Sequence, residues 1–135
     1  MQKIIQEKYT IAVIEDEEVI ARPLIEELES AGFDVIKASD GKEGLDMVLK
    51  EKPDLILLDI VMPNLDGMTM MHMLRASGAY GEHVPIILLT NLNVDDKIIG
   101  DITKDAPAYY LIKAEYSLAD VIEKVKACLS ARPSS

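Results

Sequence analysis

Residues 54–67 constrain the fold most strongly, because a run of large aliphatic residues ends there in a carboxylate and then in a turn. Residues 55–58 read Leu-Ile-Leu-Leu, with no polar position on either face, which is typical of a strand buried on both faces of a sheet. Asp59 comes next, and residues 63–67 are rich in Pro, Asn, Asp and Gly, which favour a turn. Asp59 is therefore expected at the carboxyl end of a buried strand, where open parallel sheets keep their ligand crevices.

Strand-length apolar runs recur along the chain, and a helix-length segment fills each gap between them. This alternation predicts parallel βα units joined by right-handed crossovers. A length of 135 residues fits one such α/β domain. The predicted strands cover residues 9–14, 34–38, 54–59, 85–90 and 108–113.

Apolar residues at helical spacing indicate which faces of the helices turn inward. A methionine-rich segment, residues 68–73, predicts adaptable core packing in a third helix. Pro23 falls inside the first helix pattern and should bend it. The expected inward positions are Ile20, Leu24 and Leu28 before Gly32, then Leu45, Val48 and Leu49 after Asp40-Gly41, and finally Leu118, Val121, Ile122, Val125 and Leu129 after the N-cap candidate Ser117.

Polar residues stand at the ends of four of the predicted strands: Glu15-Asp16, Asp59, Thr90 and Lys113. Each alone has a structural explanation. The acidic pair could favour a helix N-terminus, Asp59 could cap the next helix, Thr90 could be structural and Lys113 solvated. Because the carboxyl ends of parallel strands meet at one edge of a sheet, the joint pattern favours a functional site.

This order of residues resembles the receiver domain of two-component response regulators, in particular a chemotaxis-type single-domain receiver. The resemblance covers roughly residues 8–131, with residues 1–7 as an N-terminal extension and 132–135 as a tail or linker stub. It implies a flavodoxin-like, doubly wound, five-stranded parallel sheet of order 2-1-3-4-5 with five flanking helices.

The resemblance also implies a function, in which Asp59 accepts a phosphoryl group from a phosphohistidine donor with Mg²⁺ (or Mn²⁺) as cofactor. The donor would be a sensor histidine kinase or a histidine phosphotransfer protein, and an unidentified downstream protein would be controlled by the face around the helix before the fifth strand. The implied metal ligands are Glu15, Asp16, Asp59 and the backbone carbonyl of Val61; Thr90 and Lys113 would contact the phosphoryl group, and Thr90 and Tyr110 would form the switch.

Three departures from the family pattern gather near the fifth strand. Ala114 stands where most receivers have Pro after the lysine, Asn91 replaces a small residue, and residues 105–108 read Asp-Ala-Pro-Ala. A second hypothesis is therefore a phosphorylation-independent pseudo-receiver that serves as a protein-interaction module. A hydrolase with an aspartyl nucleophile is a weaker third, because Val61 stands where such enzymes carry a second Asp.

Composition limits the classes of partner that the chain is expected to bind and the compartment in which it is expected to act. A formal net charge of −10 disfavours direct binding to nucleic acid, and no apolar run has the length of a membrane helix. The lone Cys128 excludes an internal disulfide and fits a cytoplasmic location, with Cys128 as a small packing residue. His72 and His83 have no partners at zinc-ligand spacing. The sequence is compatible with a monomer or a phosphorylation-dependent dimer.

Overall fold

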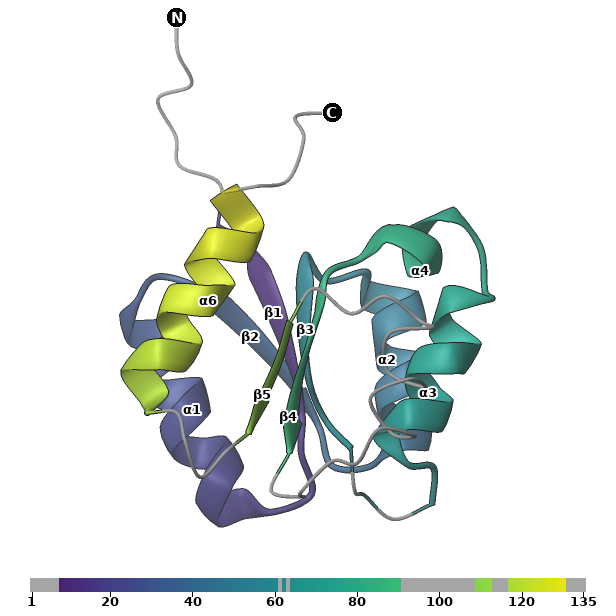
Figure 1. The fold of residues 1–135 in the computed structure, drawn as a ribbon, viewed down its shortest axis with the longest axis horizontal. Coiled ribbons are helices and arrows are strands. Elements are labelled where there is room, and N and C mark those ends of the chain that lie inside the picture. The colour runs from purple at the N-terminus through teal and green to yellow at the C-terminus, as the bar shows by residue number, and fades with distance from the viewer. Residues whose placement is uncertain (1–7, 61, 63, 91–108, 113–116, 131–135) are drawn as a thin grey trace, which may run out of the picture.

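A five-stranded parallel sheet forms the centre of the molecule, in the order β2-β1-β3-β4-β5 (Figure 1). The structure, a computed structural model, describes residues 8–60, 62, 64–90, 109–112 and 117–130, with the backbone alone for residues 90 and 109–112. Strand order and direction confirm the expected α/β fold. The strands are β1 (Thr10–Ile14), β2 (Asp34–Ala38), β3 (Leu55–Asp59), β4 (Ile86–Thr90) and β5 (Tyr109–Ile112).

Helices cover both faces of the sheet (Figure 1). On one face lie α1 (Glu18–Ser30) and α6 (Leu118–Ser130), and on the other α2 (Gly41–Glu51), α3 (Gly67–Arg75) and the short α4 (Ala79–His83). The sequence predicted one helix between β3 and β4, but the chain breaks at Gly78, whose φ is +140°. The helix predicted between β4 and β5 falls within residues 91–108, outside the described residues.

Alternation along the strands builds one hydrophobic core on each face, because successive side chains of a strand point to opposite sides. Leu55 and Leu57 pack with α1 and α6, whereas Ile56 and Leu58 pack with α2 and α3. Met70 and Met71 of α3 are fully buried in the second core, as the sequence predicted, whereas Met73 of the same methionine-rich segment is 45% exposed.

The helix ends agree with the sequence more closely than the helix faces do. Ser117 caps α6: its Oγ accepts from the Asp120 amide, and its own amide donates to the Asp120 carboxylate. Leu49 and Leu118, predicted to face inward, are each 38% exposed. The buried positions of α2 are Gly41, Gly44 and Val48, so Leu49 points about 100° away from Val48. In α6 the buried stripe begins at Val121, one turn after Leu118.

Candidate functional site

Asp59 is the last residue of β3 and is buried, with 6% of its surface exposed. The four residues before it are large, aliphatic and buried, which fixes β3 between β1 and β4. Asp59 pairs in register with Leu89 of β4. The strand therefore delivers a carboxylate to the carboxyl edge of the sheet, as the sequence predicted.

Glu15 follows β1 directly and is also buried, at 3% exposure. Ile14 of β1 pairs with Leu58 of β3. Glu15 and Asp59 are the next residues of the two chain segments, so they lie at equivalent positions at the ends of neighbouring strands. The Glu15 amide donates to the Ala38 carbonyl at 3.1 Å, and Oε2 of its side chain accepts from the Glu17 amide at 3.1 Å. Glu15 and Asp59 are the buried charged side chains of the described part of the chain.

Three carboxylates gather where β1 ends. Each of Glu15, Asp16 and Glu17 offers an oxygen within 4.8 Å of the other two, and the described residues contain no second group of this kind. Asp16 and Glu17 are exposed. Magnesium prefers oxygen ligands and keeps several waters, so one buried and two exposed carboxylates suit it as a donor set. Asp59, at the end of the neighbouring strand β3, is not a member of this group of three. Glu17 was not predicted as a site residue, although it belongs to the acidic run 15–18.

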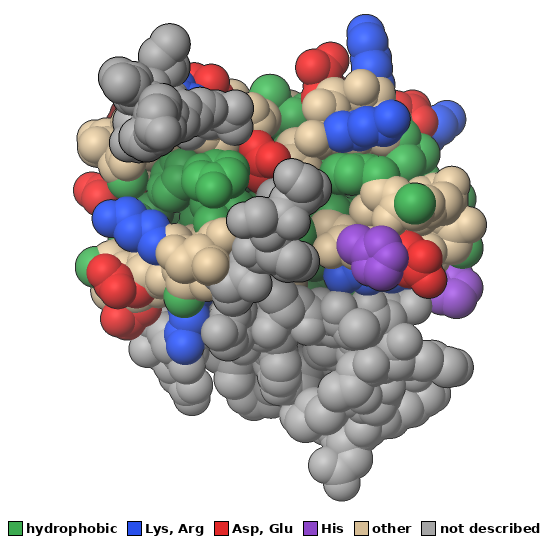
Figure 2. Space-filling model, turned by 90° about the horizontal axis from the view of Figure 1, so that it is seen from above, with side chains coloured by type: hydrophobic (Ala, Val, Ile, Leu, Met, Phe, Trp, Pro, Cys, Tyr) green, Lys and Arg blue, Asp and Glu red, His purple; other side chains and the backbone are tan. Residues whose placement is uncertain are grey.

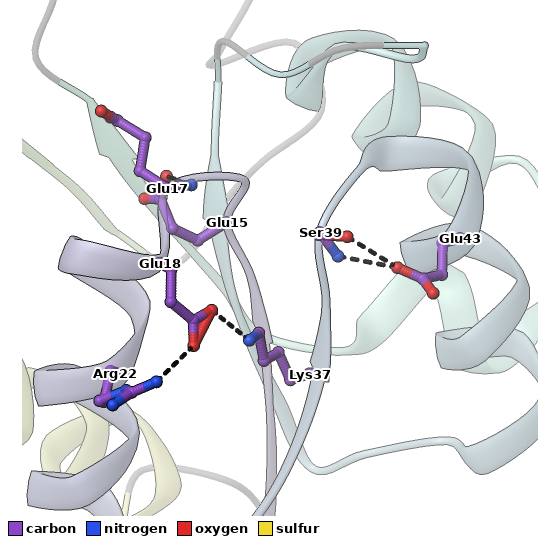
Figure 3. A network of polar contacts seen from close by, with 7 residues as sticks. All are labelled: Glu15, Glu17, Glu18, Arg22, Lys37, Ser39 and Glu43. Carbon is purple, nitrogen blue, oxygen red and sulfur yellow. Dashed lines mark hydrogen bonds and ion pairs between the residues drawn. The ribbon is translucent and has the colours of Figure 1, made fainter.

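Glu18, the fourth acidic residue of that run, turns toward two cations instead (Figure 3). Its carboxylate contacts Lys37 of β2 at 2.5 Å and Arg22 of α1 at 3.7 Å. The hydrogen bond from Lys37, aided by Arg22, lowers the pKa of Glu18 below its usual value. The contacts connect the first turn of α1 to β2, just after the acidic cluster.

The remaining predicted site residues are described in part or not at all. Thr90 ends β4 and pairs with Ile112, which puts its backbone at the same edge of the sheet as Asp59. Tyr110 lies in β5, with its backbone in register with Leu88. Val61 and Lys113 lie outside the described residues, and so does Ala114.

Gly67, which the sequence indicates only as a turn residue, approaches the backbone of Asp59 closely. A Cβ on Gly67 would lie 2.1 Å from the carbonyl oxygen of Asp59. The Gly67 amide donates to the Ile60 carbonyl at 2.8 Å. The start of α3 therefore rests on the backbone of Asp59 itself, in a space that admits no side chain.

The end of the molecule opposite Asp59 has a surface of mixed composition. Hydrophobic, acidic and basic side chains are interspersed there (Figure 2). An open pocket at that end is lined by Tyr9, Phe33, Lys126, Leu129 and Ser130. Tyr9 precedes β1, so this pocket lies at the amino ends of the strands, away from Asp59. None of the helices in the described part of the chain has the length and hydropathy to cross a membrane.

Comparison with known proteins agrees with this arrangement. The response regulator receiver domain family matches residues 11–126. The alkaline phosphatase synthesis transcriptional regulatory protein PhoP of Bacillus subtilis is 40% identical over 131 residues, covering 93% of this chain and 52% of that protein. Response regulator MprA of Mycolicibacterium vanbaalenii is 31% identical, covering 88% of this chain and 49% of MprA.

Among solved structures, the receiver domain of the Francisella response regulator 1452 superposes with a TM-score of 0.81 at 28% identity, covering 91% of this chain and 98% of that domain. The chain spans about half the length of the curated relatives it matches. Family match, fold and strand-end carboxylates agree, and the chain belongs to the response regulator receiver domain family of two-component signalling.

Proposed function

We propose that this chain is a phosphoacceptor whose Asp59 takes a phosphoryl group in a Mg²⁺-dependent reaction. The observation that carries the proposal is the burial of Asp59 at the end of β3, one strand away from the three gathered carboxylates. Burial limits the access of water to the Asp59 carboxylate, and the oxygen ligands gathered at the end of the neighbouring strand support a bound cation as part of the working site.

In the proposed reaction a carboxylate oxygen of Asp59 attacks the phosphorus of the donor. A P–O bond to Asp59 forms as the donor's bond to phosphorus breaks, and the leaving group keeps the electron pair. Glu15, Asp16 and Asp59, with the carbonyl of Val61, would hold Mg²⁺, which when bound neutralises charge on the phosphoryl oxygens. Lys113 would add a second positive charge and Thr90 a hydroxyl donor.

The acyl phosphate would carry roughly two negative charges in place of the single charge of the Asp59 carboxylate, a net gain of about one negative charge at the edge of the sheet. Thr90 would then move toward the phosphoryl group and Tyr110 would follow, which changes the face around β5 and the segment before it. We assign the receiver to residues 8–131 and place its action in the cytoplasm. A sensor histidine kinase or a histidine phosphotransfer protein would be the donor, and a protein the target.

Intact-protein mass after incubation with acetyl phosphate tests the proposal. The wild type should gain the mass of one phosphoryl group with Mg²⁺ present and none with a chelator. Asp59→Asn should gain none. Asp34→Asn is the matched control, because Asp34 is an exposed Asp at the amino end of β2 and its replacement should leave the gain intact.

Labelling of Asp59→Asn would refute Asp59 as acceptor. No gain by the wild type, with acetyl phosphate or with a phosphorylated histidine phosphotransfer protein, would favour the pseudo-receiver instead. Calorimetric titration with Mg²⁺ gives a second criterion, because a pseudo-receiver should bind the metal poorly.

A further inference from the structure

The loop between β3 and α3 is held against α2 by a backbone approach and a side-chain hydrogen bond. A Cβ on Gly41, the first residue of α2, would lie 1.8 Å from the carbonyl oxygen of Leu65. The loop therefore touches the start of α2 with no side chain between them. At its far end the same loop is closed by the hydrogen bond from the Gly67 amide to the carbonyl of Ile60, the residue that follows β3.

Asn64 forms the side-chain contact. Its Nδ2 donates to Oδ2 of Asp40 at 3.0 Å, joining residues 24 apart in sequence. Asn64 also has a φ of +68°, the left-handed region that few residues other than Gly adopt. Asn tolerates that conformation and carries a donor, which Gly lacks. Asn64 thus serves two purposes: it adopts the positive φ that the loop requires, and it donates the hydrogen bond that connects the loop to α2.

Asp40 uses its two carboxylate oxygens for different purposes. Oδ1 accepts from the Glu43 amide at 2.8 Å and caps α2, while Oδ2 accepts from Asn64. Helix α2 is in turn fixed to β1, because a Cβ on Gly44 would lie 2.9 Å from the side chain of Ile14. Ile14 is the residue before Glu15. One chain of contacts therefore runs from the strand that carries the acidic cluster, through α2, to the loop that follows Asp59.

On the basis of the proposed function, we propose that Asn64 is a positioning residue of the phosphorylation site. Its hydrogen bond to Asp40 fixes the β3–α3 loop on α2 and so holds the backbone that follows Asp59 for cation binding and phosphoryl transfer. Because the bond is exposed, it contributes little to global stability. Displacement of a reacting group by about 1 Å, in contrast, can reduce a rate roughly 100-fold.

Exchanging the hydrogen-bond donor and acceptor between Asn64 and Asp40 tests their hydrogen bond directly. Asn64→Asp keeps the size and the tolerance for positive φ but sets a carboxylate against that of Asp40. Asp40→Asn alone should have a smaller effect, because the Asn64 amide can turn and accept. The double variant restores a donor and an acceptor in reversed order. Asn64→Gly removes the amide without adding charge.

Three quantities are measured for each variant: the Mg²⁺ dissociation constant by calorimetry, the phosphorylation rate with acetyl phosphate, and hydrogen exchange of the Gly67 amide. Asn64→Asp and Asn64→Gly should weaken Mg²⁺ binding roughly tenfold, as loss of a supporting contact around a metal site does. Both should also slow phosphorylation and speed the exchange at Gly67. The double variant should recover all three.

Ser117→Ala is the control for stability, since it removes the N-cap of α6, a helix on the face of the sheet opposite α2 and α3. It should lower Tm while Mg²⁺ affinity and Gly67 exchange stay unchanged. Wild-type values in both Asn64 variants, or no recovery in the double variant, would overturn the proposal. A wild type that neither binds Mg²⁺ nor gains a phosphoryl group would instead refute the proposed function, and Gly67 exchange would still decide whether Asn64 orders the loop.

Discussion

Replacement of Gly67 by Ala tests whether the start of α3 rests on the backbone of Asp59. The added Cβ would lie 2.1 Å from the Asp59 carbonyl oxygen and 2.9 Å from the Asp59 carbonyl carbon and the Ile60 Cα. All three are backbone atoms, so no side-chain rotation relieves the contact. An ordinary contact needs about 3.5 Å. Helix α3 or the end of β3 must therefore move by about 1.4 Å.

The expected loss of stability follows from that displacement. Overpacking of this kind costs about 1–3 kcal/mol. Ala gains about 1 kcal/mol over Gly from helix propensity, which offsets part of the loss. A net loss of up to about 2 kcal/mol would lower Tm by up to roughly 7 °C in a chain of this length. Since the displaced atoms belong to Asp59 and Ile60, phosphorylation should fall by more than stability alone explains.

Gly32→Ala provides the matched comparison. Gly32 has a φ of +99° and no atom within 4 Å of a Cβ, so Ala there strains the backbone by about 1–2 kcal/mol without a clash. Gly32 follows α1, at the end of the sheet opposite Asp59. Both variants should lose similar Tm in differential scanning calorimetry, and only Gly67→Ala should lose phosphorylation and Mg²⁺ affinity. Wild-type Tm and rate in Gly67→Ala would refute the packing argument, and an equal loss of rate in Gly32→Ala would attribute the effect to stability.

Two further predictions concern ionisation. The Glu43 amide and the Asn64 side chain lower the pKa of Asp40. The stability that this carboxylate contributes is therefore present at neutral pH and is lost as the pH falls through the lowered pKa. NMR titration should give Asp40 a midpoint below that of an unshifted Asp, and Asn64→Gly should raise that midpoint. Burial raises the pKa of the Cys128 thiol, and the charge of Lys124 opposes this shift. A thiol reagent at pH 8 should therefore react slowly with the native protein and fast with the protein unfolded in urea. Equal rates would contradict the burial of Cys128.

The strands were predictable from sequence because each is an uninterrupted apolar run bounded by polar or turn residues. The observed β3, for example, begins one residue after the predicted start and ends at the same Asp59. Helix faces were harder to predict. On α2 the sequence favoured leucines, but small residues at Gly41 and Gly44 let the helix come close to Leu65 and Ile14, and Leu49 remains partly exposed.

The candidate site shows the same division between local and tertiary information. The positions of Glu15, Asp16 and Asp59 at strand ends could be predicted, because strand ends are local features and parallel topology brings them to one edge of the sheet. The need for glycine at position 67 could not be predicted, because Gly67 has no positive φ. Glycine is needed there because the Asp59 carbonyl, eight residues earlier in the chain, leaves no room for a Cβ. Asn64 and Asp40 illustrate the same limit: both favour turns or caps by composition, and only the folded chain brings them together.

Charge accounts for the combination of a buried acceptor with exposed neighbours. Under the proposed function, phosphorylation replaces the single negative charge of the Asp59 carboxylate with roughly two on the phosphoryl group, next to an acidic cluster whose innermost member, Glu15, is buried. Like charges in a partly desolvated site repel strongly, so the phosphorylated state would be costly with protein groups alone. Asp16 and Glu17 face solvent, where a hydrated cation can arrive without opening the core. The buried carboxylates then give the site its fixed geometry and the exposed ones its access, which is why rigid support of the β3–α3 loop should matter more for cation binding than for the stability of the fold.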